Sequence, residues 1–132
     1  MRTSGLEEYI IQIKASSYTV IDILQPNKFD FVYIDGDHAY AQFKRDLLNY
    51  TKVVKIGGII CGDDLEICPD EIDVISAKKY YEEDAIVDPK TKKRFHPSIA
   101  LSVLEVFGND ISMKNGFWAM RRVKDNWESI IL

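Results

Sequence analysis

The sequence predicts an α/β fold in which two parallel strands are joined by a helix. Two short apolar runs, residues 29–35 and 57–64, each end in acidic residues and are typical of strands buried on both faces. Between them, large apolar residues recur at helical spacing, at Tyr40, Phe43, Leu47 and Tyr50. The order strand, helix, strand implies a right-handed parallel crossover.

The residues before the first buried run predict one more strand and a short helix. Residues 9–14 are rich in β-branched side chains and favour a strand. Residues 16–24 follow as a helix, with a serine available as its cap. Asp37 is the expected N-cap of the helix that starts near His38.

The second half of the chain is expected to complete the domain with a helix and a hairpin. Residues 67–83 have a partly helical pattern, and the charged residues 84–94 indicate a surface loop. Pro97 begins a helix that Gly108 ends. Asn115-Gly116, between two strand-like runs, predicts an antiparallel hairpin. Together these elements predict a single three-layer domain over residues 1–132.

Composition limits the classes of function. A chain of 132 residues with a net charge of −4 argues against general affinity for nucleic acid or anionic membranes. No apolar run approaches the roughly 20 residues of a membrane span, and no signal peptide is recognisable. Cys61 and Cys68 are the only cysteines, and their spacing fits neither a disulfide framework nor a zinc motif. A cytoplasmic location is therefore expected.

Acidic pairs follow both buried strands, and they predict a metal site. Parallel neighbouring strands lie about 5 Å apart, so their terminal carboxylates would crowd one space. Like charges repel there unless a cation lies among them. The residues concerned are Asp35, Asp37, Asp63 and Asp64. The alternative is that these aspartates cap helices and turns, where aspartate is common.

The order of these landmarks resembles class I S-adenosylmethionine-dependent methyltransferases, and most closely their metal-dependent O-methyltransferase branch. The resemblance rests on Tyr33-Ile-Asp-Gly-Asp-His38 followed by a helix, and on Gly57-Gly-Ile-Ile-Cys-Gly-Asp-Asp64. The segment from His96 to Phe107 and the hairpin at Gly116-Phe-Trp-Ala-Met120 are also similar. The resemblance implies the C-terminal portion of a Rossmann-like methyltransferase sheet.

One departure from that family concerns the cofactor site. The family has a glycine-rich turn after its first strand, whereas this chain has no G-x-G ahead of residues 29–35. The chain is therefore expected to start near the family's third strand and to be truncated. Its strand at 9–14 would then pair directly with 29–35, or a sheet edge would stay exposed. Exposed edges favour pairing with another chain, so a homodimer is expected.

The resemblance also assigns roles to individual residues. It implies Asp35, Asp63 and Asp64 as ligands of Mg²⁺ or a similar divalent cation. It implies Asp37 as general base, with His38 assisting, although both also suit the start of a helix. Ser16 and Ser17, with Asp35, would contact S-adenosylmethionine, while a helix cap is the simpler role for the two serines.

Some residues have simpler explanations than a functional one. A basic segment could steer an anionic substrate, and it consists of Lys90, Lys92, Lys93 and Arg94. Segments of this kind are more often simply solvent-exposed loops. His96 could reach the rim of the site, although its place before Pro97 is sufficient explanation. Cys61 is predicted to be a small core residue.

The function implied by the resemblance is transfer of a methyl group from S-adenosylmethionine to a hydroxyl of a sugar or other small molecule. One alternative is a non-catalytic remnant that dimerises or binds a partner. A second is a metal-dependent glycosyltransferase that uses Asp35-Gly-Asp37 to hold a metal diphosphate.

Overall fold

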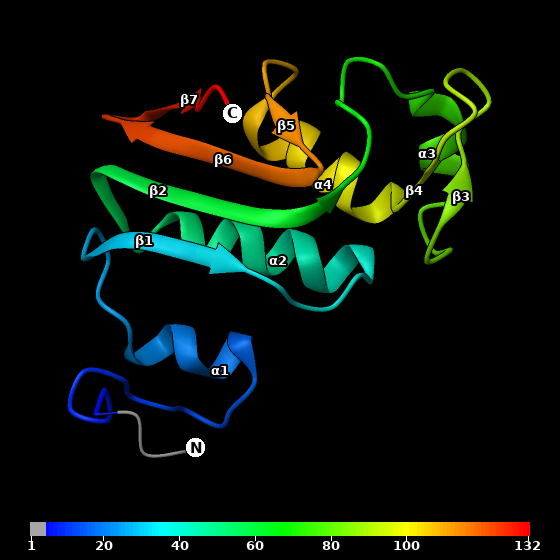
Figure 1. Ribbon diagram of the computed structural model, residues 1–132. Helices are drawn as coiled ribbons and strands as arrows, with labels where there is room; N and C mark the ends of the chain where they lie inside the picture. Colours follow the sequence, from blue (N-terminus) through cyan, green and yellow to red (C-terminus); the bar gives the residue numbers. More distant parts are fainter. Residues whose placement is uncertain (1–4) are drawn as a thin grey trace.

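The computed structural model describes residues 5–132, and its centre is a five-stranded mixed sheet (Figure 1). The strands β1 (Phe29–Ile34) and β2 (Val54–Leu65) are parallel, with Tyr33 opposite Cys61. On the other side of β2 lies the antiparallel strand β6 (Gly116–Val123), which in turn pairs with β5 (Met113–Lys114) and β7 (Asn126–Ser129). The predicted α/β class, parallel pair and closing hairpin are confirmed.

Two helices cover one face of this sheet. They are α2 (Tyr40–Thr51), which connects β1 to β2, and α4 (Pro97–Phe107). Apolar side chains from the sheet and both helices form the core, including Ile34, Ile60, Trp118, Phe43, Leu47, Ile99 and Val103. Gly108 ends α4 with a φ of 87°, as predicted. The predicted cap of α2 is wrong: its N-cap is Ala39, with no side-chain capping bond.

The opposite face of the sheet carries no helix among residues 5–132 (Figure 1). On β1, the side chains of Phe29, Phe31 and Tyr33 are 37%, 58% and 46% exposed. Ile56 on β2 is 63% exposed. The described part of the chain thus forms two layers, and the expected third layer is not found in it.

The predicted strand at residues 9–14 is wrong. These residues have no regular secondary structure, and Tyr9, Ile10, Ile11 and Ile13 are exposed. Their β-branched side chains suit a strand, but a strand is stable only where a neighbouring edge accepts its hydrogen bonds. The helical turns that follow, α1 (Ser17–Val20) and the 3₁₀ turn η1 (Ile21–Ile23), lie beyond β1 (Figure 1). β1 is therefore an edge strand. This confirms the expectation of an exposed sheet edge over that of a strand at 9–14 paired with β1.

The segment between β2 and α4 is more ordered than predicted. It contains the short helix α3 (Val74–Lys79) and a small hairpin of β3 (Ile86–Val87) and β4 (Arg94–Phe95). The loop expected over 84–94 is thus a hairpin, held by the buried carboxylate of Asp88. Its basic side chains are exposed. Within residues 5–132, no helix has the length and apolar character needed to cross a bilayer.

Candidate functional site

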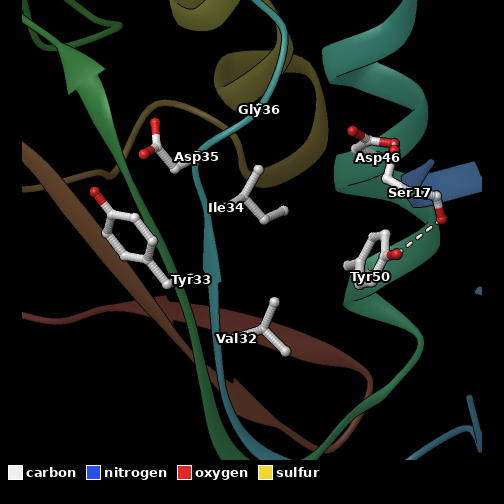
Figure 2. A pocket seen from close by; sticks show the side chains of 8 residues that line it. All are labelled: Ser17, Val32, Tyr33, Ile34, Asp35, Gly36, Asp46 and Tyr50. Carbon is white, nitrogen blue, oxygen red and sulfur yellow. Dashed lines mark hydrogen bonds between the residues drawn. The ribbon is translucent and has the colours of Figure 1, made fainter. Parts of the chain in front are cut away.

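A hollow of about 260 Å³ lies where β1 ends, between that strand and the helices α1 and α2 (Figure 2). The carboxyl ends of parallel strands are the usual ligand-binding edge of such sheets. Val32, Ile34 and Tyr50 give the hollow an apolar wall, and Ser17 and Asp46 give it polar groups. The remaining lining residues are Tyr33, Asp35 and Gly36.

Two hydrogen bonds fix the helical side of the hollow. The Ser17 hydroxyl donates to Asp46 Oδ1 over 2.7 Å, and the Tyr50 hydroxyl donates to the backbone carbonyl of Ser17 over 2.8 Å. Asp46 is only 6% exposed. Sequence reasoning missed Asp46. The available signal was its position four residues before Tyr50 and next to the apolar Leu47, because residues four apart lie on the same face of a helix.

On the other side of β1, a tyrosine and two carboxylates gather. The side chains of Tyr33 and Asp35 point away from Ser17 and Asp46 (Figure 2). The Tyr33 hydroxyl donates to Asp63 Oδ2 at a distance of 3.4 Å. Partial burial, together with the negative charges of Asp63 and Asp35, raises the pKa of Tyr33. Asp35 thus contributes to the wall of the hollow, while its carboxylate faces the open side of the sheet.

A second polar cluster lies at the end of β2. His38 Nε2 is 2.9 Å from Asp64 Oδ2, and His38 Nδ1 is 3.2 Å from Asp84 Oδ1. Burial alone would lower the pKa of His38, but the hydrogen bonds to the two carboxylates outweigh it and raise that pKa. The rings of His38 and His96 meet edge to face, 4.4 Å apart between centroids.

His96 and Glu66 complete this cluster. The backbone N–H of His96 donates to Glu66 Oε2 over 3.2 Å, and the imidazole Nδ1 contacts Glu66 Oε1. Sequence reasoning missed Glu66, and for His96 it preferred a place at the helix start to one at the rim of the site. The available signal was a further acidic residue two positions after Asp64, directly after the predicted strand at residues 57–64.

The structure brings some of the predicted site residues together and separates others. Ser17 and the backbone of Asp35 line one hollow, but Ser16 instead pairs with the Thr19 hydroxyl at 2.8 Å. Asp37 Oδ1 accepts the backbone N–H of Ala39 over 2.8 Å and is exposed.

The carboxylates predicted to bind a metal do not form one ligand set. Among residues 5–132, the groups with ligand atoms within 4.8 Å of one another are Asp64, Glu66 and His96, and His38, Asp84 and His96. Asp63 faces Tyr33, and Asp64 faces His38. A metal role for Asp35, Asp63 and Asp64 together stays a prediction.

Comparison with known protein families gives a match to the first half of the chain. A family described as a methyltransferase domain matches residues 1–65, which include β1, α2, β2 and the whole lining of the hollow. No curated protein matches the chain. The family match supports a methyltransferase domain, and it agrees with the Rossmann-like arrangement of β1, α2 and β2.

Proposed function

We propose that this chain binds S-adenosylmethionine at the hollow beside β1 and transfers its methyl group to a hydroxyl of a sugar or other small molecule. The observation that carries the proposal is the place of the hollow. It lies at the carboxyl end of a parallel strand, and its lining residues all fall within the segment that matches methyltransferases. The two free cysteines agree with the cytoplasmic location that we also propose.

The lining of the hollow suits the adenosine part of this cofactor. Ligand pockets commonly measure about 300–1,000 Å³, so 260 Å³ accommodates a part of the molecule and not the whole. Val32, Ile34 and Tyr50 would contact the apolar faces of the base. The Asp46 carboxylate can accept hydrogen bonds from ribose hydroxyls, and the Ser17 hydroxyl orients that carboxylate. The bound cofactor supplies an electrophilic methyl group on sulfur.

Asp37 and His38 are proposed to handle the proton of the acceptor hydroxyl. Asp37 is exposed directly after the hollow-lining Gly36, where an incoming hydroxyl can reach it. His38 is held by Asp64 and Asp84, and its raised pKa favours the imidazolium form. Asp37 would therefore accept the proton, and His38 would stabilise the resulting charges. No step is assigned to a metal on Asp35, Asp63 and Asp64, because these carboxylates do not converge.

Titration with S-adenosylhomocysteine, followed by thermal unfolding, tests the cofactor site. A ligand present at about 100 times its dissociation constant adds about 2.7 kcal/mol of stability, which corresponds to several degrees in Tm. We expect this shift for the native chain and a much smaller shift for Asp46→Asn, because the amide loses charge and acceptor capacity. Asp70→Asn is the matched control, since Asp70 is exposed and does not line the hollow.

Two outcomes would contradict the proposal. One is the absence of any shift with S-adenosylhomocysteine in a folded chain. The other is a shift only with a nucleotide sugar and Mn²⁺, which would instead favour the glycosyltransferase alternative that uses Asp35 and Asp37.

A second candidate function is a module that dimerises or binds a partner without catalysis. The observation that favours it is the open face of the sheet, where Phe31 and Ile56 are exposed beside the edge strand β1. Contiguous exposed apolar residues are typical of interaction surfaces. Equilibrium sedimentation distinguishes this candidate from the methyltransferase. The candidate requires self-association or partner binding in a chain that does not bind S-adenosylhomocysteine.

A further inference from the structure

The cluster at the end of β2 is rich in carboxylates and contains no basic residue other than histidine. Asp64, Glu66 and Asp84 approach the imidazoles of His38 and His96. Within residues 5–132, no lysine or arginine forms an ion pair with any of the three carboxylates. The three carboxylates carry three negative charges, of which a protonated His38 compensates one, and a divalent cation would compensate the other two.

Three of these side chains have the spacing of a metal site. Ligand atoms of Asp64, Glu66 and His96 lie within 4.8 Å of one another, and all three residues are half-buried. Asp64 lies near the end of β2, Glu66 follows the last residue of that strand, and His96 stands immediately before α4. Two different elements therefore converge on one point.

Neighbouring groups already orient these ligands. Glu66 is held by the backbone N–H of His96, and Asp64 by His38 Nε2 at 2.9 Å. The buried Ser98 hydroxyl donates to the His38 carbonyl and so fixes the position of His38. Hydrogen bonds of this kind fix the orientation of metal ligands in proteins.

We propose that Asp64, Glu66 and His96 bind a divalent transition-metal ion such as Zn²⁺ or Mn²⁺ at the junction of β2 and α4. An imidazole beside two carboxylates favours such ions over Mg²⁺ and Ca²⁺, which prefer oxygen ligands alone. On binding, the ion takes the Nδ1 lone pair of His96, and the ring keeps its single proton on Nε2. Three protein ligands leave further coordination positions for water or a substrate oxygen. This inference does not depend on methyl transfer.

Calorimetric titration of the metal-depleted chain at pH 7 tests the site. We expect one Zn²⁺ per chain and binding of Mg²⁺ that is weaker by about 100-fold or more. His96→Gln and Glu66→Gln should each weaken Zn²⁺ binding strongly, and His38→Gln by about 10-fold, as for loss of an outer partner. Asp35→Asn is the matched control and should change the affinity by less than about twofold.

Two further measurements keep the test decisive. Circular dichroism of the metal-free variants establishes that each is folded, and Co²⁺ added to the native chain should give a paramagnetically shifted imidazole N–H resonance. Unchanged Zn²⁺ affinity in folded His96→Gln and Glu66→Gln would overturn the proposal. It would also be overturned if binding were lost in Asp35→Asn, because the ion would then lie on the opposite face of the sheet. Neither result depends on S-adenosylhomocysteine binding.

Discussion

At the scale of single residues, the two cysteines differ in their access to solvent. Cys61 is fully buried in β2, and burial raises the pKa of its thiol to about 11. Cys68 is half-buried, and its pKa is raised less, by burial and by the nearby carboxylates of Glu71 and Asp70. At pH 8 roughly one thousandth of Cys61 is thiolate, which is the reactive form.

We therefore expect iodoacetamide at pH 8 to modify Cys68 well before Cys61 in the folded chain, as measured by mass spectrometry of peptides. In denaturant the two thiols should react at similar rates, which serves as the control. Equal rates in the folded chain would show that Cys61 is not in the core.

A second prediction at this scale concerns Gly62. A Cβ at this position would lie 2.9 Å from Cζ2 of the fully buried Trp118 and 3.0 Å from the Ile34 carbonyl. Gly62→Ala should therefore lower the free energy of unfolding by about 1–3 kcal/mol in urea denaturation. Gly36→Ala is the matched control, because its Cβ would meet only Asp46 Oδ2 at an ordinary 3.5 Å. Similar losses in both variants would contradict this account.

At the scale of elements, Asp88 joins the β3–β4 hairpin to α3. Its carboxylate accepts the backbone N–H groups of Asp73, over 2.8 Å, and Thr91, over 2.6 Å. Asp73 is the N-cap of α3, and it accepts the N–H of Ser76. Burial alone would raise the pKa of Asp88, but these hydrogen bonds outweigh it and lower that pKa.

Because the folded pKa of Asp88 is lowered, its stabilising contribution is present above its unfolded pKa of about 3.9. It is lost as the pH falls through the folded value. Asp88→Asn should cost about 1–3 kcal/mol at pH 7, and the difference from the native chain should shrink toward pH 3. Chemical denaturation across this range measures the effect. A difference that stays constant down to pH 3 would contradict an ionised Asp88 as its source.

At the scale of the whole molecule, the open face and the β1 edge predict self-association. We expect concentration-dependent dimers in sedimentation equilibrium and a shift to monomer in Phe31→Ser, because Phe31 is 58% exposed on that face. Ile75→Ser is the matched control, since Ile75 is 82% exposed but belongs to α3. A native chain that stays monomeric at high concentration would contradict the homodimer.

The features that sequence alone predicts correctly are those with a local cause. The buried runs that become β1 and β2 and the Asn115-Gly116 turn are specified by neighbouring residues. Residues 9–14 have suitable strand composition, but strand formation depends on a distant edge. The site shows the same division: Ser17 and Asp46 meet only because α1 packs on α2, and His96 meets Glu66 only because α4 begins at the end of β2.

The separate contacts of Asp63 and Asp64 at the end of β2 have a consequence for how this chain can change in evolution. Asp63 contacts Tyr33 on the open face, whereas its neighbour Asp64 contacts His38 beside the helices. Substitution of Asp64 therefore alters the surroundings of His38 and leaves the contact between Asp63 and Tyr33 in place, whereas substitution of Asp63 also removes the acceptor of the Asp64 backbone N–H. Descendants of this sequence could lose Asp64 and keep Asp63 with its contacts, and a pair that looks like one motif would then be inherited as two separate traits.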